Sequence, residues 1–145
     1  MTHARWHATL RKILATAEHQ PARALKPLET LLHQIESDVT KTVGDWHVEQ
    51  TLAAISILQS RLGDRRRSAE TMIRVADHHA HQSSYYRRAY VSACAAAALE
   101  LAAAGDRSGA ARELRRAAPV AADLKPRDKL FRRAQTAVAS MPRRA

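Results

Sequence analysis

Imidazole and carboxylate side chains gather near the middle of the chain, in the sequence Asp77-His78-His79-Ala80-His81. On a helix, His81 shares a face with Asp77, four residues before it, and with His78, three residues before it. Proteins bind zinc with these two kinds of side chain. We prefer a simpler interpretation, in which exposed histidines lie near a helix C-terminus, where the helix dipole favours positive charge. The sequence therefore predicts no metal site.

Two further pairs of residues, each with at least one histidine, have spacings that could support chemistry. His3 and His7 are four residues apart and form a weaker zinc candidate. Arg74 and His79 resemble the arginine–histidine motif of the HEPN ribonucleases, a family that is also α-helical. That resemblance implies RNA cleavage by the pair, although Val75 stands where the family usually has a polar residue. A HEPN-like ribonuclease or a histidine-rich metal site is therefore the second alternative function.

Other catalytic patterns do not occur in the sequence. The four glycines, at positions 44, 63, 105 and 109, do not form a phosphate-binding loop, and there is no Gly-x-Ser-x-Gly motif. Cys94 lies in an alanine-rich apolar stretch, which indicates a buried, unreactive thiol. We therefore predict a protein that is not an enzyme and needs no cofactor.

Positive charge is in excess, with 24 Lys and Arg against 14 Asp and Glu and a formal net charge of +10. A basic surface can follow a phosphate backbone, so a nucleic-acid-binding protein is the first alternative function. No aromatic residues for base stacking interleave with the basic clusters, which favours solvated helix ends instead. The clusters are Arg65-Arg66-Arg67, Arg87-Arg88, Arg115-Arg116 and the run from Lys125 to Arg133. The tail from Pro142 to Ala145 is expected to be loose.

Length and composition predict an all-α protein. The chain has 145 residues, about one domain, with four glycines and five prolines and abundant alanine and leucine. Its single cysteine excludes an internal disulfide framework. No apolar run is long enough to span a bilayer, so we expect a cytoplasmic protein without a membrane partner.

Apolar residues recur at helical spacing over seven segments. These segments cover residues 2–19, 21–35, 46–62, 65–81, 85–104, 107–124 and 127–140. Short connections predict antiparallel hairpins at about 2–38, 45–82 and 84–124, followed by a terminal helix at 126–140. We expect them to stack as a short solenoid in a single domain, 1–145.

The second and third hairpins repeat each other. Gly63-Asp64-Arg65 recurs 42 residues later as Gly105-Asp106-Arg107. In each copy the glycine suits the left-handed position that ends a helix, and the aspartate suits the N-cap of the next helix. Similarity at a fixed spacing is typical of stacked repeats.

This pattern resembles the tetratricopeptide repeat over roughly residues 46 to 124. The family has small residues where its helices cross and early in each second helix, followed there by a bulky apolar residue. The matching positions are Ser56 and Ala98, Ser68 and Ala110, and Met72 and Leu114. The spacing exceeds the usual repeat of about 34 residues, and Leu52 and Cys94 replace the family's large aromatic residue.

The resemblance implies a protein-interaction module whose first helices line a concave groove. The expected partner is a protein or peptide, acidic or ending in a free carboxylate, bound by a monomer or a homodimer. Tyr85 beside Arg88 is a further candidate anchor for the partner. The residues predicted to face the groove are Gln50, Ala53, Ile57, Arg61, Ser92 and Leu99.

Overall fold

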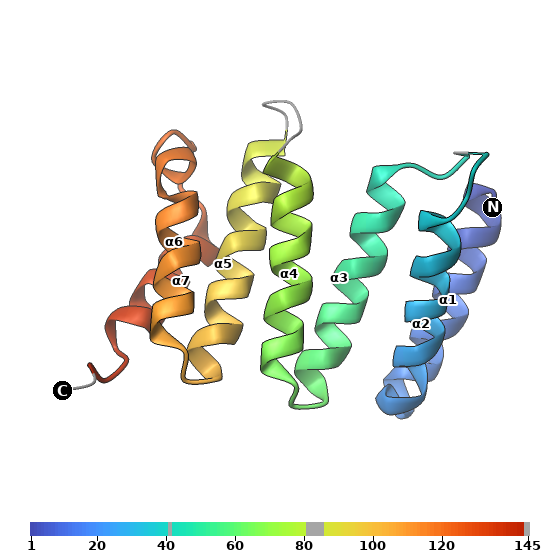
Figure 1. Ribbon diagram of the computed structural model, residues 1–145, viewed down its shortest axis with the longest axis horizontal. Helices are drawn as coiled ribbons and strands as arrows, with labels where there is room; N and C mark the ends of the chain where they lie inside the picture. Colours follow the sequence, from blue (N-terminus) through green and yellow to red (C-terminus); the bar gives the residue numbers. More distant parts are fainter. Residues whose placement is uncertain (41, 81–85, 144–145) are drawn as a thin grey trace. The chain divides into compact units, whose positions relative to one another are not determined.

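The computed structural model describes residues 1–40, 42–80 and 86–143. Seven α-helices and no strands occur in these ranges (Figure 1), which confirms the all-α class. The helices are α1 (His3–His19), α2 (Pro21–Glu36), α3 (Asp45–Arg61), α4 (Arg65–Ala80), α5 (Arg87–Ala103), α6 (Arg107–Ala122) and α7 (Lys129–Ala139). None of the helices in the described ranges is long and apolar enough to cross a membrane.

The chain folds as two compact units. The first, Met1–Asp64, contains α1 to α3, and the second, Arg65–Ala145, contains α4 to α7. In the first unit α2 packs against both α1 and α3. In the second unit α5 is the central helix and packs against α4, α6 and α7. The boundary falls in the turn between α3 and α4, within the predicted hairpin 45–82.

A buried hydrogen bond joins the first and third helices of the first unit. The indole nitrogen of Trp6 donates to the Thr51 hydroxyl at 3.1 Å, and that hydroxyl donates to the carbonyl of His47 at 2.7 Å. Trp6 and Thr51 are both almost fully buried. The hydroxyl thus gives the indole the partner that a buried N–H requires.

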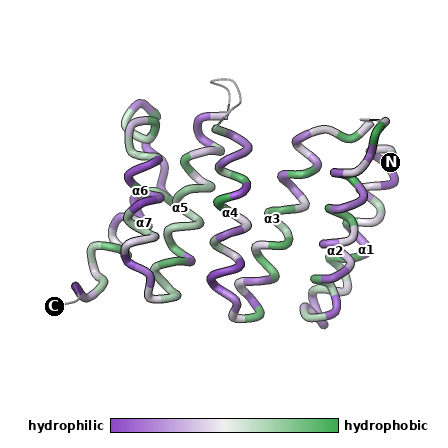
Figure 2. Tube along the Cα trace, in the orientation of Figure 1, coloured by the Kyte–Doolittle hydropathy of each residue, from purple (hydrophilic) through white to green (hydrophobic). Residues whose placement is uncertain are grey.

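Small side chains allow α5 to be packed on several sides. Its fully buried residues include four alanines, and short side chains let neighbouring helices approach closely. Figure 2 shows α5 pale to green along much of its length, whereas the first turns of α4 are strongly hydrophilic. The buried residues of α5 are Val91, Ala93, Cys94, Ala95, Ala97, Ala98 and Leu101.

The two predicted glycine turns have the same backbone geometry. Gly63 and Gly105 have φ angles of 83° and 81°, which confirms the left-handed conformation expected from the sequence. After each glycine, the aspartate N–H bonds back to the helix, from Asp64 to Gln59 at 2.9 Å and from Asp106 to Leu101 at 2.8 Å. Each glycine N–H also bonds back, at 3.0 Å. Both turns are therefore Schellman motifs, 42 residues apart.

Replacing Gly105 measures the cost of backbone strain alone, because no atom lies within 4 Å of the position of an added Cβ and a side chain would meet no clash there. We expect Gly105→Ala to lower the free energy of unfolding by about 1–2 kcal/mol, because an L-residue is strained at this φ. Gly105→Asn should lose less, because asparagine tolerates the left-handed region. Urea unfolding measures both variants, and equal losses for alanine and asparagine would contradict this explanation.

Candidate functional site

Four of the predicted groove residues lie along one stripe of α3 in the first unit. Gln50, Ala53, Ile57 and Arg61 follow helical spacing, and Ile57 is 61% exposed. Trp46, at the start of the same stripe, is 50% exposed. Isolated exposed apolar residues are ordinary, but two large ones on one stripe give α3 a surface that a partner could cover. Partner binding by this stripe stays a prediction.

The other predicted partner-binding residues belong to the second unit, where Ser92 of the groove set and the anchor candidate Arg88 hold a loop. Ser92 donates to the Asp128 carboxylate at 3.0 Å, and Arg88 donates to the Pro126 carbonyl at 2.9 Å. These bonds attach α5 to the segment before α7. Leu99 is half-buried on α5, and Tyr85 lies outside the described residues.

The candidate catalytic and metal-binding residues of α4 are already in contact with neighbours. Asp77 accepts a hydrogen bond from Arg116 at 2.5 Å, and His79 is buried with its ring stacked 5.4 Å from that of Tyr86. Arg74 is exposed, whereas His79 is buried. His81 lies outside the described residues. Among those described, no group of three or more histidine, cysteine or acidic side chains could hold a metal ion.

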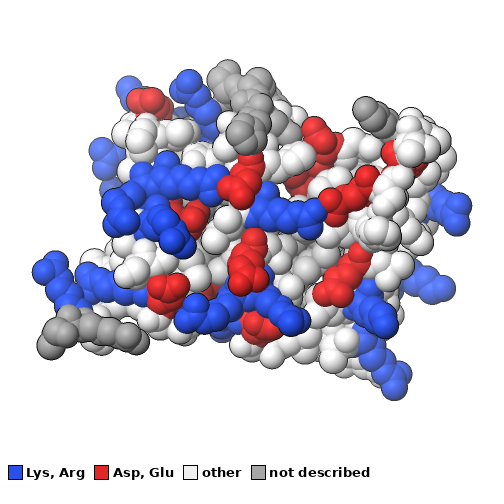
Figure 3. All heavy atoms as spheres, in the orientation of Figure 1, with Lys and Arg blue, Asp and Glu red and all other residues white. Residues whose placement is uncertain are grey.

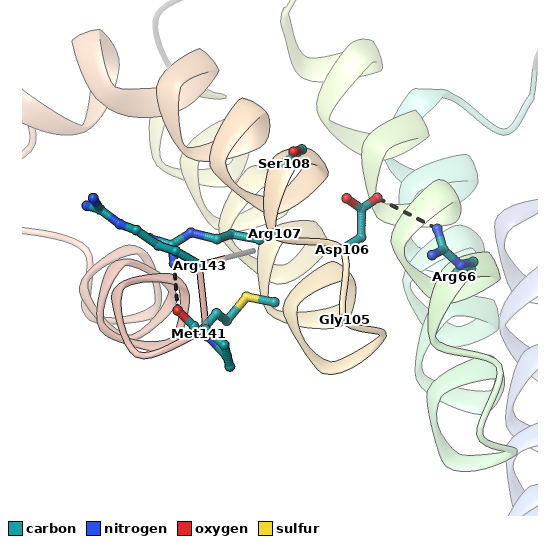
Figure 4. A pocket seen from close by; sticks show the side chains of 8 residues that line it. Arg66, Gly105, Asp106, Arg107, Ser108, Met141 and Arg143 are labelled. Atoms are coloured by element: carbon teal, nitrogen blue, oxygen red, sulfur yellow. Dashed lines mark hydrogen bonds and ion pairs between the residues drawn. The ribbon is translucent and has the colours of Figure 1, made fainter. Parts of the chain in front are cut away.

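Three arginines surround a cleft of about 970 Å³ in the second unit (Figure 4). Arg66 comes from the first turn of α4, Arg107 from the first turn of α6, and Arg143 from the segment after α7. The turn between α5 and α6 forms the side of the cleft, and Met141 with Pro142 adds apolar surface. We call these lining residues the arginine cleft, and their full set is Arg66, Gly105, Asp106, Arg107, Ser108, Met141, Pro142 and Arg143.

Asp106 has two roles in the arginine cleft. One carboxylate oxygen accepts the N–H of Gly109 at 2.8 Å and caps α6, as the sequence predicts. The other lies 3.7 Å from the Arg66 guanidinium, and Figure 4 shows the two side chains pointing toward each other. Arg66 is largely exposed, so this ion pair is weak.

Equivalent arginines after the two glycine turns have different partners. Arg65 lies 3.2 Å from the carboxylate of Glu100 on α5, which compensates its charge. Arg107, its counterpart 42 residues later, donates instead to the backbone carbonyl of Met141 at 2.5 Å. A carbonyl accepts a hydrogen bond but carries no full negative charge, so it does not compensate the positive charge of Arg107. Arg143 makes no ion pair with any residue in the described ranges.

The charges of the arginine cleft suit an anion. Among the residues that the structure describes, its lining has three guanidinium groups and one carboxylate. Guanidinium groups bind carboxylates or phosphates through paired hydrogen bonds. The sequence favours solvated helix ends for the basic clusters, including residues 65–67, and predicts a loose tail. The cleft depends on packing between α4, the α5–α6 turn and the tail, which no local pattern reveals.

On the face shown in Figure 3, basic residues are dispersed among acidic ones. In Figure 3, Lys and Arg side chains lie beside Asp and Glu across the face in view. Arg116 is an example, since it contacts both Asp77 and Glu113 and also lies over the Tyr90 ring, 5.4 Å from its centre. Burial acts to lower the pKa of Arg116, but the hydrogen bond to Asp77 and the charge interactions with Tyr90, Cys94 and Asp77 together raise that pKa above its usual value. On this face, such mixing does not make a continuous phosphate-binding surface.

No family model, curated protein or solved structure matches the chain. The site is therefore defined by the residues and contacts of this chain alone.

The reactivity of Cys94 follows from its burial. Cys94 is fully buried on α5, and burial raises the pKa of its thiol to about 11. Because the thiolate is the reactive form, we expect the folded protein to react with Ellman's reagent at pH 8 far more slowly than protein unfolded in guanidinium. Rapid labelling of the folded protein would contradict the assignment of an unreactive core thiol.

Proposed function

We propose that the protein is a non-catalytic binding module that holds an acidic segment of a partner protein in the arginine cleft. One observation carries the proposal, which is that Arg107 is bonded to a neutral carbonyl where its counterpart Arg65 faces a carboxylate. The positive charge left at the second turn provides a binding site for a carboxylate side chain or a chain terminus.

The composition of the cleft supports a peptide as the anion. Met141 and Pro142 lie beside the three arginines, so an apolar side chain next to an acidic one could be bound as well. A cleft of about 970 Å³ is large enough for several residues of an extended peptide. The partner class agrees with the one implied by the resemblance to tetratricopeptide repeats, and the net charge of +10 would attract it from solution.

Asp106 limits the affinity in this proposal. Its carboxylate lies beside Arg66 and repels an incoming acidic group. A neutral side chain of the same shape would keep an oxygen for the Gly109 N–H and remove the repulsion. The proposal therefore requires that one substitution strengthens binding while others weaken it.

Binding of a dye-labelled acidic peptide, such as Asp-Glu-Glu-Leu-Asp-Glu, tests the proposal by fluorescence anisotropy at low salt. We expect Arg107→Gln to weaken binding about tenfold, because it removes a partly buried charge-assisted donor. Arg66→Gln should weaken it about threefold, since this arginine is more exposed. Asp106→Asn should tighten binding about threefold, because it removes the competing carboxylate.

Matched variants distinguish the cleft from general attraction to a basic protein. Arg87→Gln removes the same charge at the opposite end of α5 and should leave affinity nearly unchanged. Arg61→Gln reports on the predicted α3 stripe. Equal losses for all four arginine variants, or a loss confined to Arg61→Gln, would overturn the proposal. A duplex DNA that competes with the peptide and depends equally on every arginine would instead favour the nucleic-acid alternative.

A further inference from the structure

Five aromatic rings gather where the start of α1 meets the start of α3, in the first unit. Trp6 is buried at the centre, and the His47 ring meets it edge-on at 4.7 Å. Trp46 also meets Trp6 edge-on, at 5.5 Å. On the exposed side, the His3 ring stacks on that of His7 at 6.0 Å. These contacts, with the Trp6–Thr51 hydrogen bond, hold α1 against α3.

Two hydrogen bonds fix the protons of His3 and His47. The backbone N–H of Gly44 donates to Nδ1 of His47 at 3.0 Å, so this nitrogen carries no proton. The other nitrogen of that ring, Nε2, lies 2.9 Å from Nδ1 of His3. The bonding pattern assigns the proton to Nε2 of His47 and leaves Nδ1 of His3 as the acceptor. Both rings are neutral in this arrangement.

Adding a proton to either acceptor nitrogen breaks the chain of hydrogen bonds. On Nδ1 of His3 it would place two hydrogens within the 2.9 Å gap between the rings. On Nδ1 of His47 it would face the N–H of Gly44. His47 is also the third residue of α3, where the helix dipole disfavours positive charge. The geometry is thus stable only while both rings are uncharged.

We propose that His3 and His47 form a proton-operated latch, which holds α1 against α3 at neutral pH and releases that contact on mild acidification. Opening of the latch frees the side of Trp6 that His47 covers. It also changes the surroundings of Trp46, which begins the exposed stripe of α3. The latch lies in the first unit and does not depend on the function proposed for the arginine cleft.

The direction of the pH effect follows from the burial of His47 and from its neighbour His3. Burial lowers the pKa of His47 and its charge interaction with His3 lowers that pKa further, and together they outweigh the contact with the Gly44 backbone, which acts in the opposite direction. A group whose pKa is lower in the folded state than in the unfolded state stabilises the fold above its unfolded pKa, about 6.5 for histidine. That stability is lost as the pH falls below this value and through the folded pKa of His47.

Other titratable groups lie around the histidine pair. His7 from α1 stacks on His3, and Asp45 lies in the first turn of α3. Asp38, on the segment after α2, lies 2.7 Å from the amine of Met1. Hydrogen bonds from that amine and from Thr40 hold the pKa of Asp38 far below its usual range, so Asp38 stays charged throughout mild acidification. The Asp38–Met1 ion pair therefore does not account for the proposed response to mild acid.

Tryptophan accessibility measures the opening of the latch. In the full chain carrying Trp46→Phe, Trp6 is the only fluorophore of its kind, because the sequence contains two tryptophans. We expect the acrylamide quenching constant of Trp6 to rise at least about twofold between pH 7.5 and pH 5, as the local contact opens. Far-UV circular dichroism should show that the helix content is kept.

A second substitution in the same background separates the latch from other effects of acid. In His47→Gln, the glutamine can accept the Gly44 N–H as in a capping box but does not titrate, so the rise should disappear. His19→Gln, at the far end of α1, should keep it. A quenching constant that does not change with pH would overturn the proposal. So would a rise that survives His47→Gln, or one that accompanies general loss of helix.

Discussion

The reversal at Gly105-Asp106-Arg107 is the constraint on which both the fold of the second unit and its site depend. The left-handed glycine ends α5, and the carboxylate that follows caps α6. The same turn brings Arg107 to the carbonyl of Met141 and fixes the tail after α7. Because these consecutive residues form one side of the arginine cleft, the turn that directs the chain also presents its charge.

The turns at Gly63 and Gly105 differ in the partner of the arginine that follows each of them. Both turns have the same glycine conformation and the same pair of backbone hydrogen bonds. Arg65 then has the carboxylate of Glu100 as its partner, whereas a backbone carbonyl takes that place for Arg107. The second turn therefore has a hydrogen bond where the first has an ion pair, and the positive charge of Arg107 has no carboxylate partner. The two turns therefore differ in the group that accepts the hydrogen bond, because both carry an arginine at the same position.

The helices, their connections and the two glycine turns could be predicted from the sequence, because periodicity, N-caps and left-handed glycines are local signals. The arginine cleft could not, since Arg66, Arg107 and Arg143 are far apart in the sequence and only packing brings them together. The sequence pairs His3 with His7 along one helix, but the hydrogen bond of His3 joins it to His47 on another helix. Arg88 and Ser92 are predicted from the sequence to face a partner, but their side chains are hydrogen-bonded to the loop before α7.

Chemical-shift mapping tests the central claim, that the second turn is the binding site, most directly. Adding an acidic peptide to isotope-labelled protein should shift the backbone amides of Gly105 to Gly109 and of Met141 and Arg143. The amides around Gly63, in the turn with the same backbone but a compensated arginine, should not move. Equal shifts at both turns, or shifts confined to α3, would contradict the account.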